Sequence, residues 1–241
     1  MKAYNLILTA AGVTSPSLNS RLFSGGKSQI LINGKTIIDR VLDTFPGAKR
    51  VSIAVNDDQN GRELIEILSK THPHVTIVLV PEGTKGALAS ACYAAGSVDK
   101  EEALVVANGD VEILDGLAEL AIEEFCSSQK KGGTIAFKSV NPRYSYLRGG
   151  TGSDPVSAVV EKEVVGELAT TGTFMFANLK IFLESAEWCF LNQIQLNSSY
   201  FMSSTLNRII FEGGELFVKQ VPSSSVTQFA TLEDIENYEK H

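Results

Sequence analysis

The stretch that decides the fold lies near the start of the chain and reads Tyr4-Asn5-Leu6-Ile7-Leu8-Thr9-Ala10-Ala11-Gly12. Residues 4–8 predict a strand that is apolar on both faces, which is typical of a buried parallel sheet. A long loop rich in Gly and Ser follows this strand as far as Gly34. Because ligands collect at the carboxyl ends of strands in open parallel sheets, this loop is a candidate phosphate site.

Three more short runs of Val, Ile and Leu predict further buried strands, at residues 51–55, 75–80 and 104–107. Amphipathic segments of helical length lie between these runs. The first begins after Thr36 as the N-cap, the second contains Leu64, and the third begins near Gly86. This alternation of strands and helices indicates βαβ units in an α/β fold with a mainly parallel sheet.

The second half of the chain has a looser pattern. Helices are predicted at residues 114–127, 179–190, 204–211 and from Leu232 onward. Strands are predicted at residues 134–138, 156–160, 172–176 and 216–221. The stretch 141–155 carries Gly, Ser and Pro and predicts a mobile loop. With 241 residues and no internal repeat or low-complexity linker, we expect one domain over residues 1–241.

Composition narrows the classes of function. Hydrophobic residues at 44% and charged residues at 20% exclude a disordered chain. The net charge of −7 and the scattered basic residues argue against nucleic acid as a partner. Cys92, Cys126 and Cys189 lie far apart, which indicates thiols in a reducing compartment. No apolar run reaches the length of a membrane span, so we expect a cytoplasmic protein without a membrane partner.

Four stretches could carry chemistry, and each has a plain structural alternative. The loop with Arg21 and Lys27 is either a phosphate site or a flexible surface loop. Asn108-Gly109-Asp110 follows a buried strand and is either a Mg²⁺ site or a turn. Thr84 either contacts a nucleotide or caps a helix, and Glu161-Lys162 is by default an exposed ion pair.

Other catalytic arrangements are missing from the sequence. No Walker loop and no G-x-S-x-G motif occur, and His72-Pro73-His74 reads as a solvated turn rather than a catalytic or metal-binding group. Covalent catalysis by an activated nucleophile is therefore not indicated.

Taken in order along the chain, these and neighbouring motifs resemble those of the sugar-phosphate nucleotidyltransferase family. The resemblance rests on Ala10-Ala11-Gly12, Ser20-Arg21, Lys27, Gly34-Lys35-Thr36-Ile37-Ile38, Gly83-Thr84-Lys85-Gly86-Ala87-Leu88, Asn108-Gly109-Asp110, Glu161-Lys162, Thr171-Gly172-Thr173-Phe174 and Thr231-Leu232-Glu233-Asp234-Ile235.

The resemblance implies a single-domain, Rossmann-like three-layer α/β/α fold with a mostly parallel mixed sheet. Its nucleotide-binding half would span residues 1–112 and its acceptor-binding half residues 113–241. In such enzymes a phosphate oxygen of a small phosphorylated acceptor attacks the α-phosphate of a nucleoside triphosphate, and pyrophosphate leaves. The product would serve polysaccharide or glycoconjugate synthesis.

The resemblance also implies roles for particular residues. Arg21, Lys27 and Asp110 would be catalytic, with Asp110 holding Mg²⁺ as the cofactor. The nucleotide would be bound by Ala10, Ala11, Gly12, Gly83, Thr84, Asn108 and Gly109. The acceptor would be bound by Glu161, Lys162, Thr171 and Gly172.

The sequence also departs from the family pattern. An insertion at residues 14–17 replaces a tight turn, and Gly26 and Glu163 stand where relatives have Pro. Gln228-Phe229-Ala230 occupies the place where many relatives have a second metal-binding Asp. Mg²⁺ tolerates one protein carboxylate because it commonly keeps several waters, and Glu112 or Asp234 are candidate substitutes.

Two other functions stay open. One is a nucleotide-binding or regulatory protein that kept the fold and lost catalysis. The other is a glycosyltransferase that uses a nucleotide-sugar, for which Asp110-Val111-Glu112 would serve as a loose Asp-x-Asp motif. The nucleotide base, the acceptor and the oligomeric state are not determined by the sequence, and a homo-oligomer is compatible with it.

Overall fold

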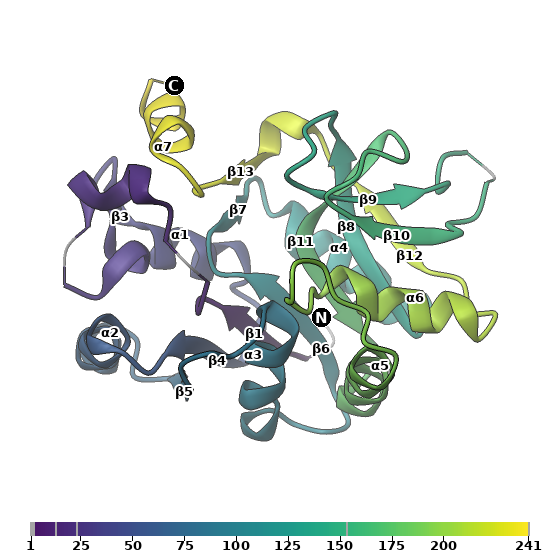
Figure 1. Cartoon of the computed structure of the whole chain (residues 1–241), viewed down its shortest axis with the longest axis horizontal. Coiled ribbons are helices and arrows are strands. Elements are labelled where there is room, and N and C mark those ends of the chain that lie inside the picture. The colour runs from purple at the N-terminus through teal and green to yellow at the C-terminus, as the bar shows by residue number, and fades with distance from the viewer. Residues whose placement is uncertain (1–2, 13, 23, 153, 241) are drawn as a thin grey trace.

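The fold is built around one nine-stranded mixed sheet (Figure 1). The computed structural model describes residues 3–12, 14–22, 24–152 and 154–240. Four strands run parallel in the order β5 (Val75–Val80), β4 (Ala48–Asn56), β1 (Tyr4–Thr9) and β6 (Ala103–Asn108). Next to β6, the strand β11 (Leu168–Phe176) runs antiparallel. The sheet therefore changes direction at β6.

The remaining strands of the large sheet extend from β11. On one path β11 pairs with β9 (Ser145–Arg148), which pairs with β10 (Ala158–Glu161). On the other, β11 pairs with β8 (Gly132–Lys138), which pairs in parallel with β12 (Phe217–Gln220). Two small sheets complete the fold, β2 (Leu31–Ile32) with β3 (Lys35–Thr36) and β7 (Val111–Ile113) with β13 (Val226–Gln228).

Two apolar cores cover the two faces of the sheet. Leu6 and Leu8 of β1 belong to one core and Ile7 to the other, because successive side chains of a strand point to opposite faces. Residues of α1 (Ile37–Thr44), α2 (Gln59–Thr71) and α4 (Leu117–Ser127) pack in the first core. Residues of α3 (Ala87–Ala94), α5 (Leu179–Leu191) and α6 (Ser203–Phe211) pack in the second. The predicted three-layer α/β/α architecture is confirmed.

Helix starts follow the local chemistry of the sequence. Thr36 caps α1, as predicted, by accepting a hydrogen bond from the Asp39 N–H at 3.2 Å. The C-terminal helix α7 (Leu232–Glu239) begins with a capping box in which Thr231 and Asp234 satisfy each other's backbone N–H groups. Short 3₁₀ helices are η1 (Pro16–Arg21), η2 (Gly26–Gln29), η3 (Ala95–Ser97) and η4 (Ser223–Ser225). No helix in the described ranges is both long and apolar enough to cross a membrane.

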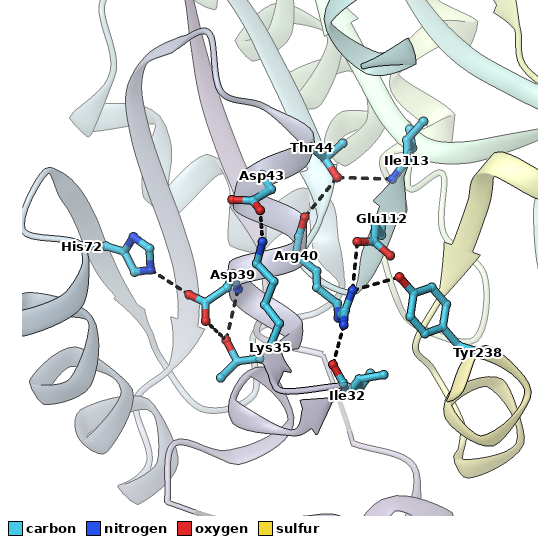
Figure 2. Close-up of polar contacts among 11 residues, drawn as sticks. Ile32, Lys35, Asp39, Arg40, Asp43, Thr44, His72, Glu112, Ile113 and Tyr238 are labelled. Carbon is cyan, nitrogen blue, oxygen red and sulfur yellow. Dashed lines mark hydrogen bonds and ion pairs between the residues drawn. The ribbon is translucent and has the colours of Figure 1, made fainter. Parts of the chain in front are cut away.

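Two predictions about local structure are wrong, and a third, the helix at 114–127, is confirmed with a later start. The stretch 141–155, of which residue 153 lies outside the described residues, is not simply a loop, because Ser145–Arg148 form β9. Tyr146 and Leu147 are fully buried there, so packing outweighs the surrounding Gly and Pro. The helix predicted from residue 114 begins at 117, after Gly116 in a left-handed conformation. His72 is not simply solvated, since its Nε2 lies 2.8 Å from Asp39 Oδ1 (Figure 2).

The C-terminal helix α7 is tied to the N-terminal half through charged side chains. A buried arginine on α1, Arg40, donates to the Tyr238 hydroxyl at 2.9 Å and lies 3.4 Å from Glu112 Oε1 (Figure 2). It also donates to the Ile32 carbonyl. Arg40 is 8% exposed and Glu112 is 7% exposed, so this ion pair lies almost wholly out of water. Figure 1 shows α7 (yellow) beside the N-terminal segments (purple).

The Arg40–Glu112 pair gives a test of how the fold is held together. Replacing only one partner leaves a buried charge without its counter-ion, so Glu112→Leu and Arg40→Met should each lower the free energy of unfolding by about 3–5 kcal/mol. The double variant should be more stable than either single variant, because it leaves neither charge uncompensated. Urea denaturation of the four proteins measures this. A double variant less stable than both single variants would contradict the assignment.

Candidate functional site

A pocket lies at the carboxyl ends of β1 and β6 and has a volume of about 440 Å³. Segments that are distant in sequence supply its wall. They include the turn after β1, η2, the end of β4 with the start of α2, the start of α3 and the turn after β6, and Ser199, Phe201 and Gln228 also line it. The predicted site residues on this wall are Ala10, Ala11, Gly12, Lys27, Thr84, Asn108, Gly109 and Asp110. Most of the nucleotide-binding residues predicted from the sequence are thus brought together.

The turns after β1 and β6 touch each other, and Gly109 allows the contact. Its N–H donates to the Thr9 carbonyl at 3.0 Å. A Cβ at position 109 would lie 3.0 Å from Ala10 Cβ and 3.1 Å from the Thr9 carbonyl oxygen. The missing side chain therefore lets two backbone turns form one continuous floor.

The charges in this pocket form an ion pair. Lys27 Nζ lies 2.5 Å from Asp110 Oδ2, and both side chains are about one fifth exposed, at 21% and 20%. Lys27 is the only Lys or Arg among the described residues that line the pocket. The other carboxylate on the wall, Asp58, caps α2 by accepting from the Gly61 N–H at 2.8 Å. Of the two carboxylates on the wall, Asp110 is therefore the one that pairs with a cation, whereas Asp58 caps a helix.

At the start of α3, the helix cap is not Thr84. Its hydroxyl donates to the Pro81 carbonyl at 2.7 Å. The N-cap is Gly86, with φ of 91° and no capping side chain. The alternative that Thr84 is simply a helix cap is thereby excluded, and its side chain lies on the pocket wall. Gly83 is not among the described residues that line either pocket.

A second pocket of about 210 Å³ adjoins the first. All four predicted acceptor residues, Glu161, Lys162, Thr171 and Gly172, line it. Glu161 Oε2 accepts from the Ser203 hydroxyl at 2.7 Å and from the Ser145 hydroxyl. The Lys162 ammonium lies 4.9 Å from the centre of the Phe201 ring. Within the described ranges Glu161 and Lys162 do not pair with each other, so the exposed ion pair considered as the alternative is absent.

The two pockets share one wall, which Ala87, Asn108, Phe201 and Gln228 form. Gly172 brings β11 against this wall. Its φ is 82°, and a Cβ there would lie 2.4 Å from the Asn108 Nδ2 atom. A glycine at this position therefore permits the close approach of β11 to the end of β6.

Arg21 is not among the described residues that line either pocket. Its guanidinium makes two hydrogen bonds to the Glu239 carboxylate, at 2.7 Å and 3.1 Å, and so links η1 to α7. The structure does not bring Arg21 to Lys27 and Asp110, and its catalytic role stays a prediction.

The proposed substitutes for a second metal ligand also lie elsewhere. Glu112 faces Arg40, and Asp234 caps α7 and pairs with Arg143 at 2.8 Å. Neither is among the lining residues. In the described ranges no cluster of three His, Cys, Asp or Glu side chains could hold a metal ion.

Several lining residues had no signal in the sequence. Phe201 and Ser203 stand in and just after the connection between α5 and α6, and Arg143 stands before β9. No motif marks them, because they reach the pocket only through the packing of distant segments. Gln228 was noticed only as a departure from the resemblance, yet it lines both pockets.

Together, the mixed sheet, the pocket at the carboxyl ends of its parallel strands and the adjoining second pocket are typical of an α/β domain that binds ligands at the ends of its strands. The sequence profile of the MobA-like NTP transferase domain matches residues 7–148. The chain belongs to this family, and the resemblance to nucleotidyltransferases drawn from its motifs is confirmed.

Solved structures share the fold at low sequence identity. A nucleoside-diphosphate-sugar pyrophosphorylase from Vibrio cholerae RC9 has a TM-score of 0.79 and 14% identity, over 98% of this chain and 99% of that chain. A candidate glucose-1-phosphate thymidylyltransferase from Bacillus anthracis, in complex with a sucrose, has a TM-score of 0.75 and 14% identity, over 98% and 94%. A search of curated proteins found no match.

The contact between Gly172 and Asn108 can be tested by substitution. Gly172→Ala should lower the free energy of unfolding by about 1–3 kcal/mol, because it adds backbone strain and a clash with Asn108. Gly213→Ala is the matched control, since Gly213 has a φ of 78° and nothing within 4 Å of its missing Cβ. Urea denaturation should find Gly172→Ala the more damaging.

The same series separates the clash from the strain. Asn108→Ala in the Gly172→Ala background removes the clashing amide, and it should recover part of the lost stability. Equal losses in Gly172→Ala and Gly213→Ala would mean that the contact with Asn108 imposes no constraint.

Proposed function

We propose that the protein transfers a nucleoside monophosphate from a nucleoside triphosphate to a sugar phosphate or similar small phosphorylated acceptor and releases pyrophosphate. The observation that carries the proposal is the shared wall of the two pockets. A triphosphate in the first pocket and an acceptor phosphate in the second would meet at Asn108 and Gln228. Bringing two reactants together in this way supplies much of the catalysis in such transfers.

The first pocket suits the triphosphate. Lys27 supplies a positive charge at the wall, and the turn after β1 brings backbone close to a ligand at the carboxyl end of the strand. Thr84 and the uncapped start of α3 also lie on the wall and would contact the nucleoside. Backbone and one lysine together would hold the nucleotide despite the net charge of −7.

The second pocket suits a small anion that also carries a hydroxyl or amine. Lys162 forms no ion pair with another described residue, so its ammonium is available to an acceptor phosphate. Glu161 accepts from two serines through Oε2 alone, which leaves Oε1 to accept from the acceptor. We therefore assign acceptor binding to Glu161, Lys162, Thr171 and Gly172.

The reaction needs no covalent intermediate. An acceptor phosphate oxygen would form a bond to the α-phosphorus as the bond from that phosphorus to the bridging oxygen breaks, and pyrophosphate would carry the electron pair away. Lys27 would offset the charge that develops on the leaving group. Burial raises the pKa of Cys92 and of Cys189 to about 12, so both thiols stay protonated at neutral pH and neither offers a nucleophile.

The lining residues fit a divalent metal ion such as Mg²⁺. Asp110 presents a carboxylate to the pocket, and the buried Oε1 atom of Gln228 has no hydrogen-bond partner among the described residues. Oxygen atoms of this kind are the ligands that Mg²⁺ prefers, and phosphates and waters would complete its shell. The metal ion would neutralise charge on the phosphates. Lys27 would then share or release the Asp110 carboxylate.

The structural neighbours support the choice of acceptor. Their names describe a nucleoside-diphosphate-sugar pyrophosphorylase and a candidate glucose-1-phosphate thymidylyltransferase, and both names refer to sugar phosphates or their nucleotide derivatives. We extend this to the present chain, with its product used for polysaccharide or glycoconjugate synthesis in the cytoplasm.

The proposal is tested by measuring pyrophosphate release with the four common NTPs, a panel of sugar phosphates and other phosphorylated acceptors, and Mg²⁺ or Mn²⁺. Turnover is expected with at least one pair. Asp110→Asn should reduce it about a hundredfold or more, because the transition state loses a charged group. Asp43→Asn is the control, since Asp43 is 63% exposed on α1 and lines neither pocket.

The outcomes separate the three candidate functions. Measurable NTP binding without turnover would favour a nucleotide-binding or regulatory protein. Binding of a nucleotide-sugar with glycosyl transfer and no pyrophosphate release would favour a glycosyltransferase. Turnover that survives Asp110→Asn would contradict the role assigned to that carboxylate.

A further inference from the structure

The acceptor pocket contains an acidic and a basic residue that are adjacent in sequence and yet form no ion pair. Glu161 ends β10, Lys162 follows it, and both line the pocket. Among the residues that the structure describes, the Lys162 ammonium pairs with no carboxylate and Glu161 pairs with no cation. Because opposite charges in one small pocket attract each other, other contacts must hold these two apart.

The chain between α5 and the first residue of α6 contacts both charges. The Lys162 ammonium lies 4.9 Å from the centre of the Phe201 ring. Two residues after Phe201, the Ser203 hydroxyl donates to Glu161 Oε2 at 2.7 Å, and Ser145 of β9 donates to the same oxygen. One short stretch of chain therefore gives the cation an aromatic ring and gives the carboxylate a hydroxyl group.

The backbone that leads into Phe201 is fixed against the start of α3. The Tyr200 N–H donates to the Lys85 carbonyl at 3.0 Å, and the Tyr200 carbonyl accepts from the Leu88 N–H at 3.2 Å. Gly86 allows this contact, since an added Cβ there would clash with the Tyr200 carbonyl oxygen. The Phe201 ring therefore has a defined place on the wall that the two pockets share.

The backbone of Lys162 is held as well, in a conformation that is uncommon for a residue other than glycine. Its φ is 56°, in the left-handed region, and its N–H donates to the Tyr144 carbonyl at 3.0 Å. Such conformations cluster at functional sites, where the surrounding structure imposes them. A lysine ammonium ends a long flexible stem, so it needs a contact of its own to stay in one place.

An aromatic ring and a carboxylate would fix this ammonium with different consequences. A carboxylate would neutralise its charge, and an acceptor phosphate would then have to displace that carboxylate. A ring attracts the ammonium through its quadrupole and carries no net charge. The full positive charge therefore stays available to an anionic ligand, and the ammonium is already in place before the ligand binds.

We propose that Phe201 and Ser203 are positioning residues of the acceptor pocket, which keep Lys162 and Glu161 from pairing with each other. Phe201 holds the ammonium for the acceptor phosphate, and Ser203 holds the carboxylate for a hydroxyl group of the acceptor. The inference rests on the acceptor pocket proposed above. It requires an aromatic side chain at position 201, because an aliphatic one would fill the wall without holding the cation.

The first test needs no ligand. In protein with ¹³C-labelled lysine, the ε-methylene protons of Lys162, assigned with Lys162→Arg, should resonate upfield because they lie near the ring. Phe201→Leu should remove this shift, and Phe201→Tyr should retain it. Phe211→Leu is the matched control, since Phe211 is 78% exposed, contacts the Trp188 ring and lines neither pocket. A Lys162 signal unchanged in Phe201→Leu would overturn the proposal.

The second test uses inorganic phosphate as the probe for the acceptor phosphate and follows its binding by the change in the Lys162 signal. Phe201→Leu should raise the dissociation constant about threefold or more, as expected for the loss of a cation–π contact. Mono-, di- and trifluorinated phenylalanine at position 201 should raise it stepwise, since fluorine weakens the ring quadrupole and hardly changes the shape of the ring. The same residues at position 211 should have no effect.

The role of Ser203 is tested by a double-mutant cycle. Ser203→Ala removes one of the two hydroxyl groups that hold Glu161, so it should weaken phosphate binding about two- to fivefold, the strength of a partly exposed ion pair. Glu161→Gln should abolish this effect, because a neutral side chain does not form an ion pair with Lys162. Equal effects of Ser203→Ala with and without Glu161→Gln would refute the role of Ser203.

The outcomes separate this inference from the proposed function. Phosphate affinity that is constant across the fluorinated series, or higher in Phe201→Leu, would refute the positioning role alone. A wild-type Lys162 signal that does not respond to phosphate would refute the acceptor site itself, and with it any role of Phe201 in acceptor binding. Circular dichroism checks that each variant is folded, and the fluorinated series decides the matter if Phe201→Leu does not fold.

Discussion

The pairing of β6 with a parallel strand on one edge and an antiparallel strand on the other is the constraint on which the site depends. β6 runs parallel to β1 and antiparallel to β11, and its central residues Leu104, Val105 and Val106 are fully buried. In the parallel part of the sheet β4 lies on one side of β1 and β6 on the other, and such a reversal of strand order opens a crevice at the carboxyl ends of β1 and β6. The chain leaves β6 at that point with Asn108, Gly109 and Asp110. One buried strand therefore fixes both pockets relative to each other.

The C-terminal segment completes the site from the far end of the chain. β13 pairs with β7, the strand that begins directly after Asp110. Side chains of α7 then accept hydrogen bonds from three arginines of separate segments, Arg21, Arg40 and Arg143. These contacts join η1, α1 and the edge of the acceptor pocket to α7. Arg40 is the buried member of the set, and its partner Glu112 lies two residues after Asp110 in the sequence. The position of Asp110 thus depends on long-range charge pairing as well as on the sheet.

Much of the fold could be predicted from the sequence because its signals are local. Two apolar runs, Val51 to Val55 and the run that ends at Asn108, predict buried strands. Thr36 predicts the start of a helix because its side chain bonds to a backbone N–H only three residues later. β9 was missed because four residues between glycines and prolines carry little pattern of their own. β7 and β13 were missed for the same reason, since each has three residues and gains its structure from the other.

The site could be predicted only in part. Lys27, Asp110, Glu161 and Lys162 lie at strand ends or in loops that a family motif marks, and they line the two pockets. Whether they act as proposed stays a prediction. Phe201 and Gln228 carry no local signal, because their places on the shared wall result from contacts across more than a hundred residues of chain. The pairing of Arg21 with Glu239 likewise could not be predicted from the sequence.

The central claim is that nucleotide and acceptor bind in adjoining pockets that meet at Asn108 and Gln228. It is tested most directly by a crystal structure of the protein with a non-hydrolysable NTP analogue, a divalent cation and a sugar phosphate. The account predicts the triphosphate between Gly12 and Asp110 and the acceptor phosphate beside Lys162. The attacking oxygen should lie about 3–3.5 Å from the α-phosphorus. A nucleotide bound outside the first pocket, or an acceptor phosphate out of reach of the α-phosphorus, would contradict it.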